Sequence, residues 1–251
     1  MIHFVGAGCG ATDLITLRGK RHIENADVII YAGSLINKEL LQYAKKECAL
    51  YDSAKMTLEE IIDVISAAER DGLVTVRLHT GDPSLYGAIG EQMRELDRLG
   101  IEYDITPGVS AFSGAAASLK TEYTLPDVSQ TVIITRAAGR TDVPESENLR
   151  SLASHGATMV LYLSTGLLEK VSADLIAGGY DADTPAAIVY KASWEDEKVC
   201  RCTVGTLKET ADANGITKTA LITVGDFLKG SFSRSKLYDP GFSTEFREAS
   251  K

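Results

Sequence analysis

The sequence has no long apolar run and little proline. No stretch approaches the roughly 20 consecutive apolar residues that a membrane helix needs. Only 6 of 251 residues are proline, and 44% are hydrophobic, which excludes a disordered or collagen-like chain. The N-terminus has no basic cluster and Gly6 interrupts its apolar run, so it does not resemble a signal peptide. These absences predict a globular, cytoplasmic protein with no membrane partner.

Cysteine is also scarce. The four cysteines, Cys9, Cys48, Cys200 and Cys202, show no Cys-x-x-Cys spacing and no nearby histidine at a distance typical of zinc sites. We therefore expect reduced thiols, no disulfide framework and no bound metal.

Positive charge is in deficit, because 26 Lys and Arg face 35 Asp and Glu, for a formal net charge of −9. Such a surplus of negative charge repels phosphate backbones. The longest basic cluster, residues 18–22, would be spread around a helix. The balance argues against a nucleic-acid partner.

The first half alternates strand-length apolar runs with helical periodicity. The runs cover residues 2–8, 26–31, 73–80 and 101–108, and the helical segments 38–47, 57–72 and 90–100. Thr57 followed by Glu60 predicts a helix cap, and Gly72 and Gly100 stand where helices end in the left-handed region. This βαβ rhythm predicts a mainly parallel sheet.

The second half begins after a polar segment at residues 116–128, where we place the linker. Strand-like runs follow at residues 131–137, 157–165, 185–193, 199–207 and 219–228, with helical patterns at 147–156 and 167–179. Five strands with two or three helices suggest a mixed sheet. We expect two α/β domains, at residues 1–116 and 117–251, with a ligand cleft between them.

Glycine-bearing turns follow three of the predicted strands, at residues 5–10, 79–87 and 106–112. A dinucleotide-binding turn is disfavoured, because ATDLIT delays the first helix until about Leu17 and no acid follows the strand at residues 26–31. Since the carboxyl ends of parallel strands meet at one edge, the turns favour a bound small molecule.

The middle turn, LHTGDPSLYG (residues 78–87), is only partly explained by helix initiation. Asp82 suits an N-cap and Pro83 the first helical position. Gly81 needs another reason, either a positive φ or a close approach. Ser110 is the expected cap of a helix at residues 111–119, whose small side chains leave room for tight packing or for a flat ligand.

Taken together, the motifs resemble the tetrapyrrole (corrin/porphyrin) methylase family, which uses S-adenosylmethionine. The matching stretches are VGAGCGATDLITLRG (5–19), GDPSLYG (81–87), TPGVSAF (106–112), LYLST (161–165) and TALITVGD (219–226). Residues 31–41 and 134–164 are similar to family members that methylate corrin precursors in cobalamin synthesis. The resemblance covers nearly the whole chain. It implies a methyltransferase, usually a homodimer, with S-adenosylmethionine between two domains.

The resemblance also implies which residues contact the cofactor. They are Cys9 (through its backbone), Thr80, Gly81, Asp82, Ser110, Ala111, Leu163, Ala192, Thr219 and Ala220. The family usually carries Pro, Asp and Pro where this chain has Cys9, Ala11 and Thr12, so the rigidity of that turn is open. Leu163 replaces a frequent methionine of similar volume.

The tetrapyrrole substrate implied by the resemblance is rimmed with carboxylates, so an acidic chain needs a locally basic trough to hold it. The candidates are Arg18, Lys38, Arg136, Arg140 and Lys191. Arg136 and Arg140 are preferred because a guanidinium pairs with a carboxylate through two hydrogen bonds. The alternative for each is an exposed charge that serves solubility.

No catalytic residue is assigned, because methyl transfer from a sulfonium needs no covalent nucleophile. His79, beside the middle turn, is the one candidate, and a strand-end histidine satisfied by the backbone is the alternative. Three other functions remain open: a methylase of the same fold with a different target, a dinucleotide-dependent oxidoreductase, and a sensor that binds the cofactor without consuming it. Whether the substrate carries cobalt is not readable from the residues.

Overall fold

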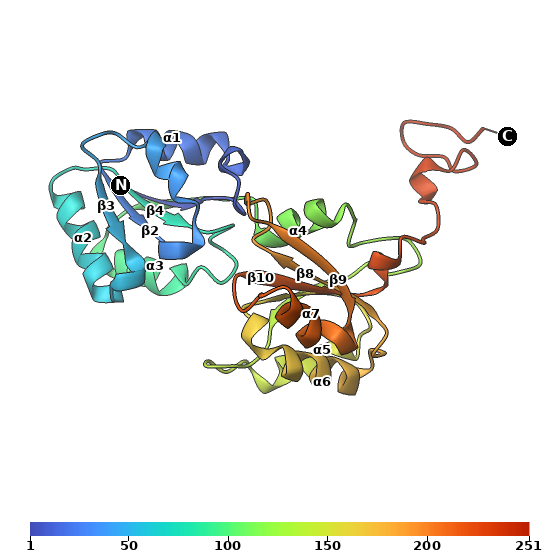
Figure 1. Ribbon diagram of the computed structural model, residues 1–251. Coiled ribbons are helices and arrows are strands. Elements are labelled where there is room, and N and C mark those ends of the chain that lie inside the picture. The colour runs from blue at the N-terminus through green and yellow to red at the C-terminus, as the bar shows by residue number, and fades with distance from the viewer. Residues whose placement is uncertain (251) are drawn as a thin grey trace. The chain divides into compact units, whose positions relative to one another are not determined.

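The computed structural model describes residues 1–250, apart from the side chain of Ser34, and Lys251 of the predicted second domain lies outside the described residues. The chain forms two compact units (Figure 1). The first comprises Met1–Ala115 together with Lys191–Glu197, and the second comprises Ala116–Tyr190 together with the described residues from Lys198 onward. The predicted division at residue 116 did not include this return of Lys191–Glu197 to the first unit.

The first unit is built on a five-stranded sheet with the order β3-β2-β4-β1-β5, and every strand pair is parallel. The prediction of a mainly parallel sheet is confirmed. Its elements are β1 (Ile2–Gly6), α1 (Leu17–Asn25), β2 (Val28–Tyr31), β3 (Ala49–Asp52), α2 (Leu58–Arg70), β4 (Thr75–His79), α3 (Ile89–Leu99), β5 (Tyr103–Thr106) and the start of α4 (Ala111–Leu119).

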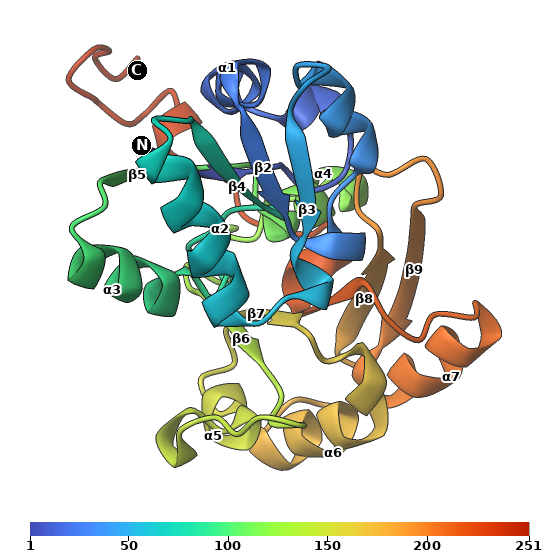
Figure 2. The same cartoon turned by 90° about the vertical axis from the view of Figure 1, so that its left-hand side faces the viewer.

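Both faces of this sheet are covered, as alternation along β1 requires. Phe4 joins the apolar cluster of α2 and α3, whereas Val5 joins the cluster that contains Ile23 of α1. Helices α2 and α3 lie side by side on the face opposite α1 (Figures 1 and 2). The predicted cap of α2 is confirmed, since Thr57 and Glu60 form a reciprocal capping box.

Three local predictions for the first unit were wrong. Strand β3 was missed, because none of its four residues is buried and its sequence shows no alternation of apolar and polar residues. Residues 38–47 do not form an α-helix but a short 3-10 helix, Lys38–Tyr43. The helix expected to open at Asp82 and Pro83 begins only at Ile89.

The second unit holds a five-stranded sheet with the order β6-β7-β10-β8-β9. Strands β6 and β7 are parallel and the other pairs antiparallel, so the predicted mixed sheet is confirmed. Its elements are β6 (Val132–Arg136), α5 (Leu149–Ala153), β7 (Thr158–Tyr162), α6 (Leu168–Gly178), β8 (Pro185–Tyr190), β9 (Lys198–Thr203), α7 (Leu207–Ala213) and β10 (Ala220–Val224).

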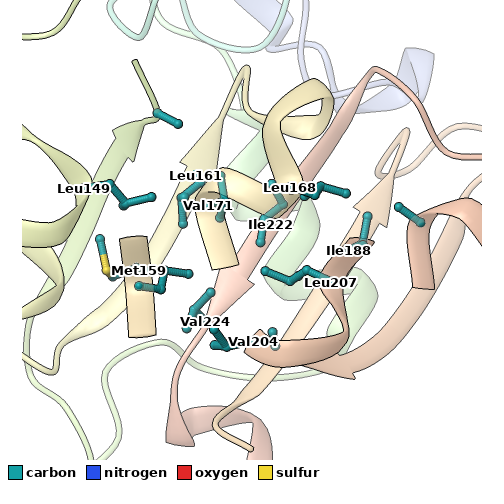
Figure 3. Packing of buried hydrophobic residues seen from close by; sticks show 14 of the residues in the cluster. Leu149, Met159, Leu161, Leu168, Val171, Ile188, Val204, Leu207, Ile222 and Val224 are labelled. Carbon is teal, nitrogen blue, oxygen red and sulfur yellow. The ribbon is translucent and has the colours of Figure 1, made fainter. Parts of the chain in front are cut away.

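Helices α5, α6 and α7 share one face of this sheet and bury its core. Figure 3 shows Leu149, Leu168 and Leu207 of these helices directed toward Met159 and Ile222 of the strands. Helix α7 was not predicted, because the apolar run at residues 199–207 was taken as one strand. The strand ends at Thr203, and Leu207, fully buried, opens the helix.

Two expectations about the whole chain can be checked. The four cysteines are free, as predicted. Among residues 1–250 no helix is both long and apolar enough to cross a membrane.

Candidate functional site

The three glycine turns of the first unit meet at the carboxyl ends of β1, β4 and β5. Gly8 and Gly81 form an isolated antiparallel bridge, in which the Gly81 N–H donates to the Gly8 carbonyl at 2.9 Å and the Gly8 N–H to the Gly81 carbonyl at 3.3 Å. Gly81 has φ +60°, so the first of the two reasons expected for this glycine is confirmed. The residue is also buried, so its backbone is enclosed on several sides.

Gly6 and Gly108 are required by the chain's own packing. A Cβ on Gly6 would lie 2.6 Å from both the Gly108 Cα and the Gly81 oxygen, and one on Gly108 would lie 2.1 Å from the Gly81 oxygen. Real Cβ atoms do not approach backbone so closely. At these two positions glycine therefore lets three turns touch, which explains their bareness without a ligand.

We call the four glycines of these turns, Gly6, Gly8, Gly81 and Gly108, the glycine rim. Asp82 holds the rim together by hydrogen bonds. Its Oδ2 accepts from the Gly108 N–H at 2.9 Å, and its Oδ1 accepts from the Ser84 N–H at 2.9 Å. Burial would raise the pKa of Asp82, but hydrogen bonds from Ser84 and Gly108 outweigh burial and lower it. Asp82 is thus a bound carboxylate in a turn, not the helix cap we predicted.

Thr80, Ser110 and Ala111 complete the predicted cofactor group around Gly81. The Thr80 hydroxyl donates to the Leu35 carbonyl at 2.7 Å. A Cβ on Gly81 would lie 3.5 Å from the Ala111 nitrogen and 3.6 Å from the Ser110 Cα. Helix α4 begins at Ala111, as predicted. The structure therefore brings these four residues together.

Cys9 and Ala192 meet at a second point of the first unit. Cys9 Sγ lies 3.3 Å from Ser193 Oγ, and the Ser193 oxygen accepts from the Ala11 N–H at 3.0 Å. An added Cβ on Gly114 would lie 2.7 Å from Cys9 Sγ and 3.4 Å from the Ala192 Cβ. The returning segment thus fixes the turn that lacks the family's prolines. Sequence reasoning missed Ser193, because no local pattern links residues so far apart.

The remaining cofactor candidates lie at one edge of the second sheet. Register pairs Ile222 with Leu161, which places the start of β10 beside the end of β7. Leu163 follows β7, and Thr219 and Ala220 open β10, where the Thr165 hydroxyl donates to the Ala220 carbonyl at 3.1 Å. Leu163 is 67% exposed.

A hollow of about 410 Å³ opens beside Leu163. Arg136 and Arg140 line it, together with Ala137, Gly139, Thr141, Gly166 and Leu167. The Arg136 guanidinium donates to the carbonyls of Thr141 at 3.0 Å and Asp142 at 2.5 Å, so it shapes its own loop. Arg140 is exposed and has no hydrogen bond or ion pair among the described residues. It is the free guanidinium of the hollow.

The other basic candidates are not among the residues that line this hollow. Arg18 and Lys38 are exposed residues of the first unit. Lys38 Nζ lies 5.6 Å above the Tyr31 ring, and Lys191 Nζ pairs with Asp196 at 2.6 Å. Solubility accounts for Arg18 and Lys38 as well as substrate binding does.

Left-handed residues other than glycine gather in the candidate loops. Such a conformation costs energy and marks sites where surrounding structure enforces it. The residues with positive φ in these loops are Tyr86, Ala88, Leu163, Lys191, Ser193 and Thr219. None is glycine, asparagine or aspartate, so the sequence carries no signal for them.

His79 does not face solvent. It is 3% exposed on β4, and its Nε2 has no hydrogen-bond partner among the described residues. Burial, with the nearby Arg77 charge, lowers the pKa of His79 to about 3. A neutral, buried imidazole favours the structural interpretation over a catalytic one, although no backbone group satisfies its Nε2.

A separate cluster unites His3, His22 and Asp104. The nitrogen and oxygen atoms of the three side chains lie within 4.8 Å of one another, and His3 Nδ1 lies 2.8 Å from Asp104 Oδ1. The imidazole rings stack at 3.9 Å with an interplanar angle of 29°. Imidazole lone pairs lie in the ring planes, and the stacking of these planes accounts for the closeness of the two histidines, so the cluster alone carries no metal assignment.

The fold and these loops can now be compared with known proteins. A family model for Tetrapyrrole (Corrin/Porphyrin) Methylases matches residues 1–208. The chain belongs to this family. Among solved structures, this tetrapyrrole methylase superposes on cobalt precorrin-4 methyltransferase CbiF with a TM-score of 0.89 and 45% identity, covering 90% of this chain and 95% of that one. It also superposes on a uroporphyrin-III C-methyltransferase from Thermus thermophilus with a TM-score of 0.76 and 26% identity, covering 91% and 96%.

Curated relatives of this tetrapyrrole methylase match it along almost its full length. A cobalt-precorrin-4 C(11)-methyltransferase of Methanocaldococcus jannaschii is 55% identical, over 98% of this chain and 96% of the relative. A precorrin-4 C(11)-methyltransferase of Pseudomonas aeruginosa is 45% identical, over 94% of each. A uroporphyrinogen-III C-methyltransferase of Bacillus subtilis is 33% identical, over 90% of each.

Proposed function

We propose that this tetrapyrrole methylase transfers a methyl group from S-adenosylmethionine to carbon 11 of precorrin-4, or of its cobalt complex, in cobalamin biosynthesis. The observation that carries the proposal is the match to the Methanocaldococcus jannaschii relative, at 55% identity over nearly the whole of both chains. The stretches at residues 31–41 and 134–164, which resemble methylases of corrin precursors, support the same substrate class.

S-adenosylmethionine, when bound, supplies a methyl group on a sulfonium, a donor that is already activated. The chain's own task is therefore alignment, which can lower a barrier by about 7 to 11 kcal/mol. The residues fit this group: Gly81 has no side chain at the rim, and Leu163 exposes an apolar side chain. We assign cofactor contacts to the two groups described above, Cys9, Thr80, Gly81, Asp82, Ser110, Ala111 and Ala192 in the first unit and Leu163, Thr219 and Ala220 in the second.

We assign the substrate's carboxylates to the hollow in the second unit. Arg140 is free to form a charge-assisted pair, and Arg136 holds the loop that carries it. Arg18 and Lys38 are secondary candidates. No general base is assigned, because His79 is buried and neutral.

The test is a turnover experiment with labelled S-adenosylmethionine and precorrin-4, prepared with and without cobalt. The expected product carries one added methyl group, which carbon-13 NMR places on carbon 11. The ratio of the two kcat/KM values identifies the natural form of the substrate. A label on another carbon would contradict the proposal.

The alternative is a methylase of another tetrapyrrole carbon, which the 33% identity to the Bacillus subtilis relative favours over a different chemistry. Uroporphyrinogen III is therefore the competing substrate in the same assay. Faster methylation of uroporphyrinogen III than of either form of precorrin-4 would select the alternative.

We further propose a cytoplasmic homodimer. The resemblance to the family supports the dimer, and exposed aromatic residues of the C-terminal segment, among them Tyr238 and Phe246, supply apolar surface for it. Sedimentation of the purified chain at micromolar concentration would reveal the dimer. Fractionation of the source cells would test the location.

A further inference from the structure

The first unit buries a positive charge without an acidic partner. Arg77, on β4, is 5% exposed, and burial lowers its pKa to about 10, so it stays charged at neutral pH. Among residues 1–250 it forms no ion pair. Since a buried charge is normally paired, the two neutral groups that Arg77 does bind need an explanation.

Those groups are the Ile30 carbonyl and the side chain of Gln92. Arg77 Nη1 donates to the carbonyl at 3.1 Å, and Arg77 Nε donates to Gln92 Oε1 at 3.0 Å. Because a guanidinium only donates, Gln92 must turn its oxygen toward Arg77 and its NH₂ away. The chemistry of Arg77 thereby fixes the orientation of the Gln92 amide.

The NH₂ group of Gln92 donates to the Ala88 carbonyl at 3.1 Å. Ala88 precedes α3 in the left-handed region, with φ +50°, and two residues before it Tyr86 has φ +57°. L-residues other than glycine rarely adopt this conformation, so neighbouring structure must hold them there. The Gln92 side chain supplies such a hold on Ala88, because its NH₂ group binds the Ala88 carbonyl directly.

Residues 80–88 form the loop that carries Thr80, Gly81 and Asp82. At its start, the bridge to Gly8 and the bond from Gly108 to Asp82 fix the backbone. At its end, the relay from Arg77 through Gln92 fixes Ala88. Both ends of the loop are thus held, one by the glycine rim and the other by a buried polar pair.

We propose that Arg77 and Gln92 are positioning residues that hold this loop in the conformation that binds the cofactor. The inference rests on the proposed function, since it assigns the loop to S-adenosylmethionine. Both side chains are at least 95% buried, so they act through Ala88 rather than by contact with the cofactor.

The substitution Gln92→Glu separates positioning from general stability. A glutamate still accepts from Arg77, and its charge strengthens that bond, but it cannot donate to Ala88. We expect S-adenosylhomocysteine to bind at least ~10-fold more weakly in calorimetry, while the melting temperature stays equal to or above that of Gln92→Leu. A purely structural role would make affinity fall in step with the melting temperature. Wild-type affinity in Gln92→Glu would overturn the inference.

A matched control is Gln130→Glu, in the second unit. The Gln130 Nε2 also donates to a backbone carbonyl, that of Thr124 at 3.3 Å, but in an exposed loop away from the candidate residues. We expect unchanged affinity in this variant. An equal loss in both variants would show that the added charge, not the lost donor, weakens binding, and would also overturn the inference.

A second substitution at Ala88 should partly reverse the effect of Gln92→Glu. Glycine occupies the left-handed region without strain, so adding Ala88→Gly to Gln92→Glu should restore part of the lost affinity. If affinity does not recover, the role assigned to Ala88 is wrong.

Hydrogen exchange keeps the inference separable from the proposed function. In Gln92→Glu the amides of residues 84–89 should exchange faster than in the wild type, whether or not any cofactor binds. Unchanged exchange would overturn the inference. A third outcome is possible, in which the wild type binds no S-adenosylhomocysteine while residues 84–89 still exchange faster in Gln92→Glu than in the wild type. That outcome would contradict the proposed function and leave the inference about Arg77 and Gln92 intact.

Discussion

The two units form their candidate edges in opposite ways. In the first unit, glycines bring backbone against backbone at Gly6, Gly81 and Gly108, and hydrogen bonds come mostly from the main chain. In the second unit, Leu163 and Thr219 adopt left-handed conformations without being glycine, and the nearby hollow presents guanidinium groups. This contrast is the basis of our proposal that peptide groups hold a ligand at the first edge and side chains recognise one at the second.

The largest expected effect is on the stability of the glycine rim. In Gly108→Ala the new Cβ would lie 2.1 Å from the Gly81 oxygen and 2.8 Å from the Gly6 Cα, so backbone must move on both sides. We expect a loss of about 3 kcal/mol in the free energy of unfolding, at the upper end for overpacking. Urea denaturation measures it.

Gly90→Ala is the control for this prediction. Gly90 lies in α3 with nothing within 4 Å of its added Cβ, and its φ is not positive. Alanine there should stabilise the chain by about 0.5 to 1 kcal/mol. Equal losses in the two variants would show that the glycine rim is not tightly packed.

The second largest expected effect is the pH dependence of stability that His79 gives to the first unit. His79 is neutral in the folded first unit, with a pKa of about 3, whereas an unfolded histidine titrates near 6.5. Well above pH 6.5 His79 carries no proton in either state. Below it the unfolded chain takes up a proton that the folded one refuses, so stability falls as pH falls, by roughly 2 kcal/mol between pH 7 and 5.

The measurement is the free energy of unfolding across pH 7 to 5 in the wild type and in His79→Phe. The variant should lose most of the slope in this range. His155→Phe is the control, since His155 is exposed in the second unit. Identical slopes in the wild type and His79→Phe would show that His79 is protonated in the folded state.

Gly81→Val tests the backbone-based edge through binding. Valine is strained at φ +60°, although its Cβ would make only ordinary contacts with Ser110 and Ala111, so the backbone strain must change the shape of the loop. We expect S-adenosylhomocysteine affinity to fall at least ~10-fold, equivalent to the loss of one hydrogen bond to a charged group. Titration calorimetry decides it, and unchanged affinity would remove Gly81 from the cofactor site.

Arg140→Ala tests the side-chain edge and should leave the other edge intact. Loss of one charge-assisted pair should raise the KM for precorrin-4 about 10-fold, without a change in S-adenosylhomocysteine affinity. Arg136→Ala should act in the same direction by releasing the loop carbonyls of Thr141 and Asp142. Weaker cofactor binding in Arg140→Ala would contradict the proposal that Arg140 binds the substrate and not the cofactor.

Much of the fold could be predicted from local pattern. The apolar runs at residues 73–80 and 157–165 contain β4 and β7, and Thr57 with Glu60 gives the start of α2. The pattern failed where a strand lacks buried residues and where distant contacts shape a turn. No residue of strand β3 is buried, and the Asp82–Pro83 pair resembles a helix start although Asp82 is bound to Gly108.

The site was predictable only as far as motif and resemblance reach. The positive φ of Gly81 followed from the residue type, since a loop places glycine where other residues are strained. The close packing that requires glycine at positions 6 and 108 could not be predicted, because the atoms that crowd these positions belong to turns some 30 to 100 residues away. Ser193, Arg77 and Gln92 gave no signal at all.

By itself, then, the sequence determined the periodicity, the order of most strands and helices along the chain, and the need for backbone freedom at Gly81. These properties depend on neighbours within one or two turns of the chain. Tertiary structure alone decided that Lys191–Glu197 returns to the first unit, that Arg77 lies buried beside Gln92, and that Leu163 is exposed in a left-handed turn. Those outcomes depend on atoms that meet only after the chain has closed long loops, and no local pattern of residues encodes such meetings.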